Sequence, residues 1–151
     1  MPDKPVVRDI EEITRRRLVI VAMETLLPQL ARLLSGTPVS LLVVCTSEQA
    51  MAGIVTKTDV LRKIAESPGA IGWLSAMDAM TSEVIHCHPG DPLEKVLEVM
   101  RNRALVHMPI IDSKARPVGV VEARDVLRAL MGYAGTQVSF LRDYIMGAGY
   151  R

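Results

Sequence analysis

Gly53-Ile54-Val55-Thr56-Lys57-Thr58-Asp59 is the stretch of sequence that decides the fold of this chain of 151 residues. It ends a short apolar run and leads directly into residues 60–65, whose apolar side chains fall at helical spacing. A glycine, two β-branched apolar residues, a hydroxyl and an acid, in this order, predict a strand that stops at the N-terminus of a helix.

The same arrangement occurs again in Gly119-Val120-Val121-Glu122-Ala123-Arg124-Asp125, which is also followed by a helical apolar pattern. The glycines (53 and 119) and the acids (59 and 125) are separated by the same number of residues. Apolar patterns upstream, in residues 26–34 and 93–100, repeat at nearly the same distance. A period this long in a chain this short indicates one unit built twice.

Each unit reads strand, helix, strand, hairpin, strand, helix, and in this order the chain resembles the cystathionine-β-synthase (CBS) domain. The resemblance rests on His107-Met108-Pro109-Ile110-Ile111-Asp112, on Pro117-Val118-Gly119-Val120-Val121 and on Asp125, with residues 53–59 as the matching copy. It covers residues 7–131. It implies an α/β (α+β) fold of two pseudo-symmetric repeats (strand-helix-strand-strand-helix) packed as one CBS pair.

The predicted domain boundaries follow from the repeat. They are a first repeat at 7–66, a linker at 67–80, a second repeat at 81–131 and a C-terminal helical tail at 132–151. Within the tail, residues 137–146 have apolar side chains on one side of an expected helix. We expect Trp73, the only tryptophan, to be a packing residue of the linker.

Several elements are expected from local signals. A strand at residues 18–21 precedes a helix at about 25–35, and Gly36 suits a left-handed cap at the end of that helix. Residues 39–44 form a continuous apolar run that is typical of a strand buried on both faces. Residues 84–88 are expected to be the first strand of the second repeat.

Composition excludes several classes of protein. Apolar residues make up 49% of the chain but aromatic residues only 3%, so the core must consist of aliphatic side chains and methionine. The net charge is +1 with both signs interleaved, which gives no footprint for nucleic acid. No apolar run reaches the ~18 residues of a membrane span, and no signal peptide is seen. We therefore expect a cytoplasmic protein in which Cys45 and Cys87 are buried thiols.

The Thr-x-x-Asp pattern of Thr56 and Asp59 leaves two interpretations open. A helix N-terminus attracts anions, and an aspartate one turn into the helix can accept hydrogen bonds from two vicinal hydroxyls, such as those of a ribose. The same two residues also form a capping pair that satisfies backbone amides without any ligand. Asp125 is favourable near a helix start for the same reason.

The family resemblance implies that the cleft between the repeats binds an adenosine compound such as AMP, ADP, ATP, NAD or S-adenosylmethionine. The ligand-binding residues that it implies are Ile54, Thr56, Thr58, Asp59, His88, Val106 and His107. A second, weaker cleft would contain Val120, Glu122, Arg124 and Asp125. We expect it to be weaker because the Glu122 carboxylate would repel a phosphate, although Arg124 offsets part of that charge.

Metal binding and catalysis have little support in the sequence. His86 and His88 share a strand face, but two histidines do not make a metal site, which needs more ligands. No catalytic residues are expected and no cofactor is required. Arg15-Arg16-Arg17, the only basic cluster, usually indicates a solvated face, and contact with a phosphate or an acidic partner is the less common alternative.

The sequence therefore predicts a regulatory adenine-nucleotide-binding module, not an enzyme, that changes shape or affinity for an unknown regulated protein when loaded. The alternative is a CBS-fold interaction scaffold that binds no nucleotide. We also expect a homodimer, because the helices after each acid carry apolar residues beyond those that the sheet needs: Val60, Leu61, Ile64, Val126, Leu127, Leu130 and Met131.

Overall fold

The computed structural model describes residues 4–132, and the predicted C-terminal helix therefore lies outside the described residues. Two compact units are present, and each combines distant parts of the chain. Of the described residues, the first unit comprises 4–17, 86–112 and 118–132, and the second comprises 18–85 and 113–117. We call residues 53–59 hallmark 1 and residues 119–125 hallmark 2. Hallmark 1 lies in the second unit, and hallmark 2 lies in the first. Each unit is named below by the hallmark that it contains. The predicted repeat boundaries follow the chain order and stay a prediction.

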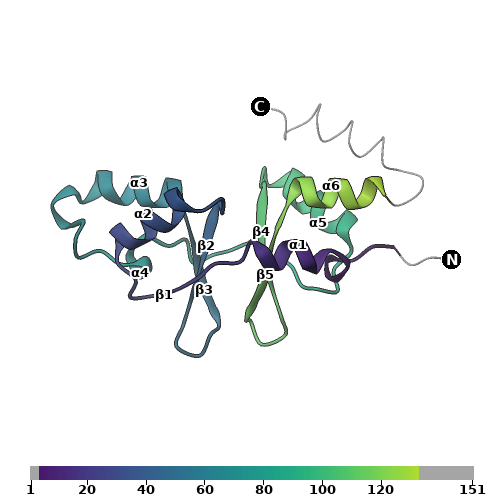
Figure 1. Ribbon diagram of the computed structural model, residues 1–151, viewed down its shortest axis with the longest axis horizontal. Helices are drawn as coiled ribbons and strands as arrows, with labels where there is room; N and C mark the ends of the chain where they lie inside the picture. The colour runs from purple at the N-terminus through teal and green to yellow at the C-terminus, as the bar shows by residue number, and fades with distance from the viewer. Residues whose placement is uncertain (1–3, 133–151) are drawn as a thin grey trace. The chain divides into compact units, whose positions relative to one another are not determined.

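The unit that contains hallmark 1 is built on a three-stranded sheet of order β1-β2-β3. Strand β1 is parallel to β2, and β2 is antiparallel to β3, with Val43 opposite Ile54. Figure 1 shows helices α2 and α3 side by side against this sheet. The elements are β1 (Ile20–Ala22), α2 (Leu27–Gly36), β2 (Leu41–Cys45), β3 (Met51–Thr56), α3 (Lys57–Glu66), the 3-10 turn η2 (Pro68–Ala70) and α4 (Ala76–Ala79).

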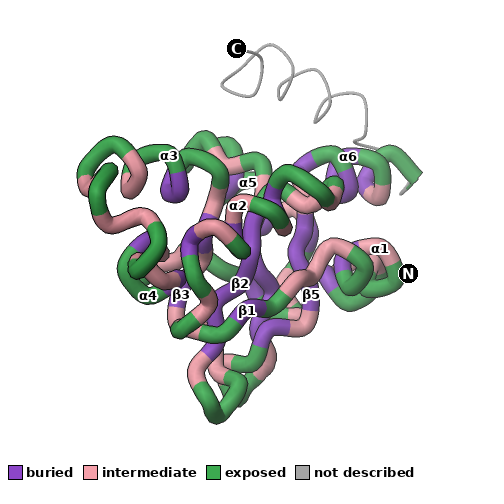
Figure 2. The backbone as a smooth tube through the Cα atoms, turned by 60° about the vertical axis from the view of Figure 1, so that its left-hand side comes forward, coloured by how far each residue is buried: buried purple, intermediate pink, exposed green. Residues whose placement is uncertain are grey.

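The core of this unit confirms the prediction for the central strand. All five residues of β2 are buried, and the strand is purple along its length in Figure 2. Strand β2 has a neighbouring strand on each edge, and its residues Leu42 and Val44 belong to the core cluster of this unit. The fully buried Leu30 of α2 and Val55 of β3 belong to the same cluster.

The unit that contains hallmark 2 has a two-stranded sheet, β4-β5, with helices α5 and α6 in contact. The N-terminal segment packs here as well, and Val7 is part of this unit's core. The elements are the 3-10 helix η1 (Val7–Ile10), α1 (Glu11–Arg16), α5 (Leu93–Asn102), β4 (His107–Ile111), β5 (Pro117–Glu122) and α6 (Ala123–Met131).

The strand expected at residues 84–88 is wrong in extent, because only a parallel bridge between Cys87 and Ile110 forms there. The Cys87 amide donates to the Pro109 carbonyl (3.0 Å), and the Ile111 amide donates to Cys87 (2.9 Å). At the next residue, the His88 amide donates to the Asp91 carboxylate instead (2.8 Å). That turn ends the pairing after one residue.

The left-handed cap expected at Gly36 is also wrong. Gly36 is the last residue of helix α2 and has no positive φ. The next residue, Thr37, is extended, and its hydroxyl donates to the Leu33 carbonyl (2.6 Å). This side-chain hydrogen bond satisfies a carbonyl at the helix end, so a left-handed glycine is not needed.

Two packing expectations need correction. Trp73 is not a packing residue, since 79% of it is exposed while its neighbours Ile71 and Leu74 pack against the core. Helix α6 does not present the expected apolar face. Its residues Val126, Leu127 and Leu130 are buried inside their own unit, and only Met131 is half-exposed.

Both hallmark glycines lie where another segment approaches the strand closely. A Cβ on Gly53 would stand 2.6 Å from the Thr81 carbonyl oxygen. A Cβ on Gly119 would stand 2.9 Å from the Thr14 hydroxyl and 3.1 Å from its carbonyl oxygen. Each glycine therefore lets a covering segment lie directly on its strand: residues 75–81 (with α4) on β3, and residues 7–17 (with α1) on β5.

We expect Gly53→Ala to lower the free energy of unfolding by about 1–3 kcal/mol, the usual cost of adding a methyl group to a filled site. Gly36→Ala is the matched control. No atom lies within 4 Å of its added Cβ, and its backbone is helical. It should raise the free energy of unfolding by up to about 1 kcal/mol, because alanine is favoured over glycine in a helix. Urea denaturation measures both, and equal stability of Gly53→Ala and wild type would contradict the close approach.

Candidate functional site

Hallmark 1 is the junction between strand β3 and helix α3. Thr56 is the extended N-cap residue, and its hydroxyl accepts the Asp59 amide hydrogen (3.3 Å). In return, Asp59 Oδ2 accepts hydrogen bonds from the Thr56 amide (2.8 Å) and from the Thr56 hydroxyl (3.0 Å). The capping pair that the sequence allowed is therefore formed in full.

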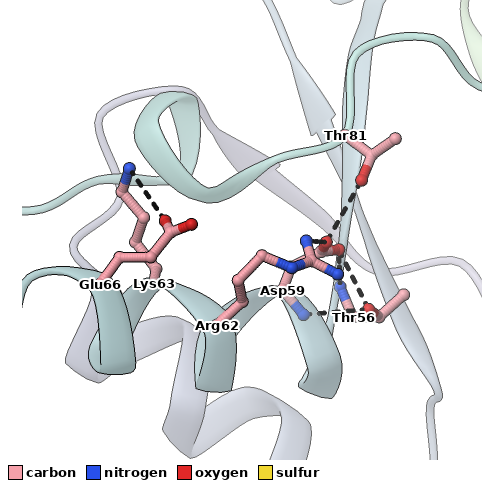
Figure 3. A network of polar contacts seen from close by, with 6 residues as sticks. All are labelled: Thr56, Asp59, Arg62, Lys63, Glu66 and Thr81. Atoms are coloured by element: carbon pink, nitrogen blue, oxygen red, sulfur yellow. Dashed lines mark hydrogen bonds and ion pairs between the residues drawn. The ribbon is translucent and has the colours of Figure 1, made fainter.

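The Asp59 carboxylate does more than cap the helix. Its other oxygen, Oδ1, accepts hydrogen bonds from the Thr81 hydroxyl and from Arg62 Nη1, both at 3.2 Å. Figure 3 shows Asp59 between Thr56 and these two side chains, with the Lys63–Glu66 ion pair further along the helix. Asp59 itself is only 5% exposed. Its partners on Oδ1 are at the surface, since Thr81 is exposed and the Arg62 side chain is 57% exposed.

Capping by an aspartate three residues along is common in this chain, so the cap alone does not mark a site. Asp9, Asp78 and Asp91 each accept the amide hydrogen of the third residue before them, at 2.8 Å. The Ser75 amide and hydroxyl lower the pKa of Asp78 in this way. Burial makes the difference, because Asp59 and Asp125 are the two carboxylates among the buried polar residues of the described chain. A buried carboxylate that is held from several sides is a candidate functional group.

Hallmark 2 contains a buried ion-pair cluster centred on Arg17. Arg17 Nε lies 2.5 Å from Glu122 Oε1, and Arg17 Nη1 pairs with Asp125 Oδ2. The side chains of Arg17 and Glu122 are each 18% exposed, and that of Asp125 is 1% exposed. Arg124 adds a longer contact to Glu122, 3.5 Å, from the surface. Two arginines therefore compensate the two acids of this hallmark.

The two buried acids differ in their free hydrogen-bonding capacity. Asp125 Oδ2 accepts the Glu122 amide hydrogen (3.1 Å) and the Arg17 guanidinium, but Asp125 Oδ1 is buried without a hydrogen-bond partner. The counterpart oxygen of Asp59 has two donors. Hallmark 2 thus has a cation on Oδ2, where hallmark 1 has the Thr56 hydroxyl. It has no donor on Oδ1, where hallmark 1 has the Thr81 hydroxyl and a surface arginine.

His107 begins strand β4 and lies in the electrostatic field of the same cluster. Burial lowers the pKa of His107; the Glu122 carboxylate raises it, and the Arg17 and Arg124 guanidinium groups lower it. The neutral imidazole is therefore favoured, and it offers one donor and one acceptor nitrogen.

These contacts change the expected charge at hallmark 2. The sequence predicted that the Glu122 carboxylate would repel a phosphate and that only Arg124 would offset part of its charge. The structure pairs Glu122 with Arg17 as well, so like-charge repulsion is largely removed. The prediction that the two sites are unequal therefore cannot rest on the charge of Glu122 alone.

The remaining predicted site residues are distributed over both units. Ile54 is half-buried on β3, Thr58 is exposed at the start of α3, and Val120 is buried on β5. His88 and Val106 belong to the unit of hallmark 2, so their place at hallmark 1 stays a prediction. His88 Nδ1 lies 3.0 Å from the Ile111 carbonyl, and because a carbonyl only accepts, this nitrogen carries the proton.

Sequence reasoning missed three polar residues of these sites: Arg17, Arg62 and Thr81. Arg15 and Arg16 pair with Glu11 and Glu12, four residues earlier, and form the expected solvated face. Arg17 has Ile13 at that position, and this lack of a local partner was the signal that could have singled it out. Thr81 lies 22 residues from Asp59, and no local pattern announces their contact.

Among the residues that the structure describes, no group of three or more potential ligands could hold a metal ion. His86 and His88 do lie together, with ring centroids 5.3 Å apart in an edge-to-face arrangement. Both cysteines are free thiols and buried, as expected. Burial, reinforced by the charge of Asp91, raises the pKa of Cys87 to about 12. Within residues 4–132, no helix combines the length and apolar character needed to cross a bilayer.

Comparison with known proteins gives one family. The CBS domain model matches residues 7–66 and 76–132. The mitochondrial CBS domain-containing protein CBSX3 of Arabidopsis thaliana is 33% identical over 105 residues, which are 68% of this chain and 50% of that protein. The chain spans half or less of the length of the first curated relatives that it matches.

Two solved structures show the same fold. A CBS domain pair in complex with 5′-methylthioadenosine and S-adenosyl-L-methionine superposes with a TM-score of 0.71 at 22% identity, covering 86% of this chain and 98% of that one. CBSX2 in complex with AMP superposes with a TM-score of 0.71 at 20% identity, covering 84% and 96%. Since the family model matches both repeats and most of the sequence, this protein belongs to the CBS domain family and has the fold of a CBS pair.

Proposed function

We propose that this protein is a regulatory module that binds an adenosine compound at hallmark 1, with Asp59 as the acceptor for the ribose hydroxyls. The observation that carries the proposal is the state of Asp59. Its carboxylate is buried, and one of its oxygens is held only by two surface side chains, Thr81 and Arg62. Hydroxyl groups of a ligand can replace these donors without leaving the buried charge unpaired.

The exchange replaces like with like at the carboxylate. A hydrogen bond to a charged group, such as that from the Thr81 hydroxyl, contributes about 1.5–3 kcal/mol net, and a ribose hydroxyl makes a bond of the same kind. A ribose offers two hydroxyls, so exchange keeps the number of hydrogen bonds and frees surface side chains. Oδ2 stays on the Thr56 amide throughout, so the carboxylate does not need to move.

The phosphate of a nucleotide would meet a favourable field at the same junction. Helix α3 has ten residues, and its N-terminal amides and dipole favour an anion. Lys57 is its first residue, and Arg62 lies on its next turn. An Arg62 side chain displaced from Asp59 would be available to a phosphate.

The comparisons support the ligand class. One of the two similar solved pairs is in complex with AMP, and the other with 5′-methylthioadenosine and S-adenosyl-L-methionine. These ligands share an adenosine moiety and differ in charge. This chain is therefore proposed to recognise the adenosine moiety. The compounds to test are AMP, ADP, ATP, NAD and S-adenosylmethionine.

The module is proposed to act without catalysis, through an unidentified partner protein, in the cytoplasm. Loading can change its shape or its affinity for the partner only if the ligand binds the two states with different affinity. The competing interpretation is a scaffold in which Asp59 serves as a cap alone. The three exposed or half-buried caps at Asp9, Asp78 and Asp91 show that the chain uses this device without burial.

We expect an adenosine ligand at about 100 times its dissociation constant to stabilise the protein by ~2.7 kcal/mol. For a chain of this size this corresponds to a rise in melting temperature of several degrees, at ~2–4 °C per kcal/mol. Thermal denaturation with AMP, ADP, ATP, NAD and S-adenosylmethionine measures it. A flat response to all five would favour the scaffold.

Asp59→Asn should reduce affinity for the ligand at least tenfold, because the ribose loses a charged acceptor while the amide oxygen can still cap Thr56. Asp78→Asn is the matched control, since Asp78 makes the same cap with Ser75 at the surface. It should leave the affinity unchanged. Isothermal calorimetry on both variants separates a ligand site from a cap, and equal affinity of the two variants would contradict the site.

We also propose a homodimer, now on the evidence of helices α2 and α3 alone. Leu61 is 67% exposed and borders a cavity of about 450 Å³ between the two helices. The cavity is lined mainly by apolar side chains: Ala31, Leu34, Val60, Leu61 and Ile64, with Ser35 and Lys57 at its edge. A two-fold contact would place Leu61 of each copy against the apolar cavity of the other.

Leu61→Glu should therefore convert the dimer to a monomer, because it would bury a charge in that contact. Ile20→Thr is the control, since Ile20 is 51% exposed but lies on strand β1. Light scattering at micromolar concentration gives the mass of each variant. A monomeric wild-type protein, or a dimer that survives Leu61→Glu, would rule out this interface.

A further inference from the structure

The Arg17 guanidinium is the least expected group near either hallmark. It comes from the residue that caps the C-terminal end of helix α1, more than a hundred positions before the two acids that it pairs with. Its immediate neighbours Arg15 and Arg16 point to solvent, with side-chain exposures of 70% and 73%. Of the three adjacent arginines, Arg17 is therefore the one whose side chain turns inward and pairs with Glu122 and Asp125.

That geometry follows from Gly119. Because this glycine has no side chain, Thr14 lies directly on strand β5 and is 1% exposed. Arg17 is three residues further along, which brings it to the same face of α1 one turn later. The strand ends at Glu122, and Asp125 follows in α6, so the guanidinium meets both carboxylates at the end of the strand.

The two covering segments therefore supply unequal donors, Thr81 to Asp59 Oδ1 and Arg17 to Asp125 Oδ2. At hallmark 1, the segment that lies on Gly53 supplies the neutral Thr81 hydroxyl to Asp59. At hallmark 2, the segment that lies on Gly119 supplies a guanidinium that pairs with Asp125 and Glu122 together. A hydroxyl is easily exchanged for a ligand hydroxyl, whereas removing a buried cation leaves two carboxylates uncompensated.

We propose that Arg17 is a built-in cationic ligand that closes hallmark 2 to nucleotides. Its guanidinium pairs with Asp125 Oδ2, the oxygen that also accepts the Glu122 amide hydrogen. It also pairs with the Glu122 carboxylate, at the position that Thr56 has in hallmark 1. Asp125 Oδ1 has no donor and is left for a ligand hydroxyl. A nucleotide phosphate at the position that Thr56 has in hallmark 1 would have to displace the guanidinium from Glu122, and would then place its own negative charge beside the two acids. Arg17 is in this sense the residue that determines how many nucleotides the chain binds. The inference rests on the proposed function for the class of ligand only.

The test is to remove the cation and the extra acid together. Arg17→Ala combined with Glu122→Thr gives hallmark 2 the Thr-x-x-Asp pattern of hallmark 1 and leaves Asp125 as its single buried acid. Calorimetry with AMP should show one site per chain in the wild type and two in this double variant. Arg15→Ala/Arg16→Ala, which removes the two exposed arginines, should keep one site.

A second pair of variants separates this inference from the function proposed for hallmark 1. In Asp59→Asn, where hallmark 1 is weakened, affinity for AMP should fall at least tenfold. Adding Arg17→Ala and Glu122→Thr should restore one site per chain. Restored AMP binding in this variant supports the closure of hallmark 2 by Arg17. If the wild-type protein binds no AMP, only the assignment of the nucleotide site to hallmark 1 is overturned.

Two results would overturn the proposal. One is a wild-type protein that binds two AMP molecules, with the second lost in Asp125→Asn. The other is a double variant that keeps the wild-type circular dichroism spectrum and cooperative melting but gains no site. If Arg17→Ala/Glu122→Thr fails to fold, Arg17→Gln/Glu122→Gln replaces it, since it removes both charges, keeps the volume at position 122 and keeps a polar side chain at position 17. The same two outcomes then apply.

Discussion

The close approach of a covering segment to each hallmark glycine is the constraint on which the rest of both units depends. Backbone atoms of Thr81 and Thr14 occupy the space that a Cβ on Gly53 or Gly119 would need. The approach at Gly53 also allows strand-like pairing, since Ile54 and Thr81 exchange two backbone hydrogen bonds of 3.0 and 2.9 Å. Any larger residue would push the segment outward and withdraw the polar side chain that it carries to the buried acid.

That constraint explains why two buried carboxylates are tolerated in units that are otherwise aliphatic inside. Burying a charge is costly unless it is paired and hydrogen-bonded. Each acid is held locally by its helix cap and from a distance by the covering segment, through Thr81 in one unit and Arg17 in the other. This cost is offset at Asp59 by hydroxyl and amide donors with one surface arginine, and at Asp125 by a buried ion pair. This difference is the basis for expecting unequal affinity.

Much of the fold could be predicted because its signals are local. The repeat fixed the order of elements, the continuous apolar run of β2 indicated burial on both faces, and Thr56 with Asp59 indicated the cap. Errors arose where a distant or neighbouring group overrode a local signal. Thr37 satisfied the helix end that Gly36 was expected to cap, and Asp91 took the His88 amide from the expected strand. The apolar side of α6 was mistaken for an outer face because periodicity alone does not say which partner covers it.

The site was harder to predict than the fold, since its acids are local features but their donors are not. Asp59 and Asp125 stand out in the sequence, whereas Thr81 and Arg17 reach them only through tertiary packing. The hairpins illustrate the contrast. Gln49 and Ala115 occupy equivalent places in the two copies, and both have a positive φ, 68° and 64°, although neither is glycine. The duplicated backbone is thus retained even in unfavourable conformations, while the side chains around the acids have diverged.

The two covering segments are exchanged between the two copies of the repeat. In sequence order, one covering segment precedes each hallmark: residues 7–17 come before hallmark 1, and residues 75–81 come before hallmark 2. In space the assignment is exchanged, since residues 7–17 lie in the unit of hallmark 2 and residues 75–81 in that of hallmark 1. Two identical single copies could exchange their segments in the same way, each covering the hallmark of the other. Within one chain the two segments can differ, and here one supplies a hydroxyl and the other a guanidinium.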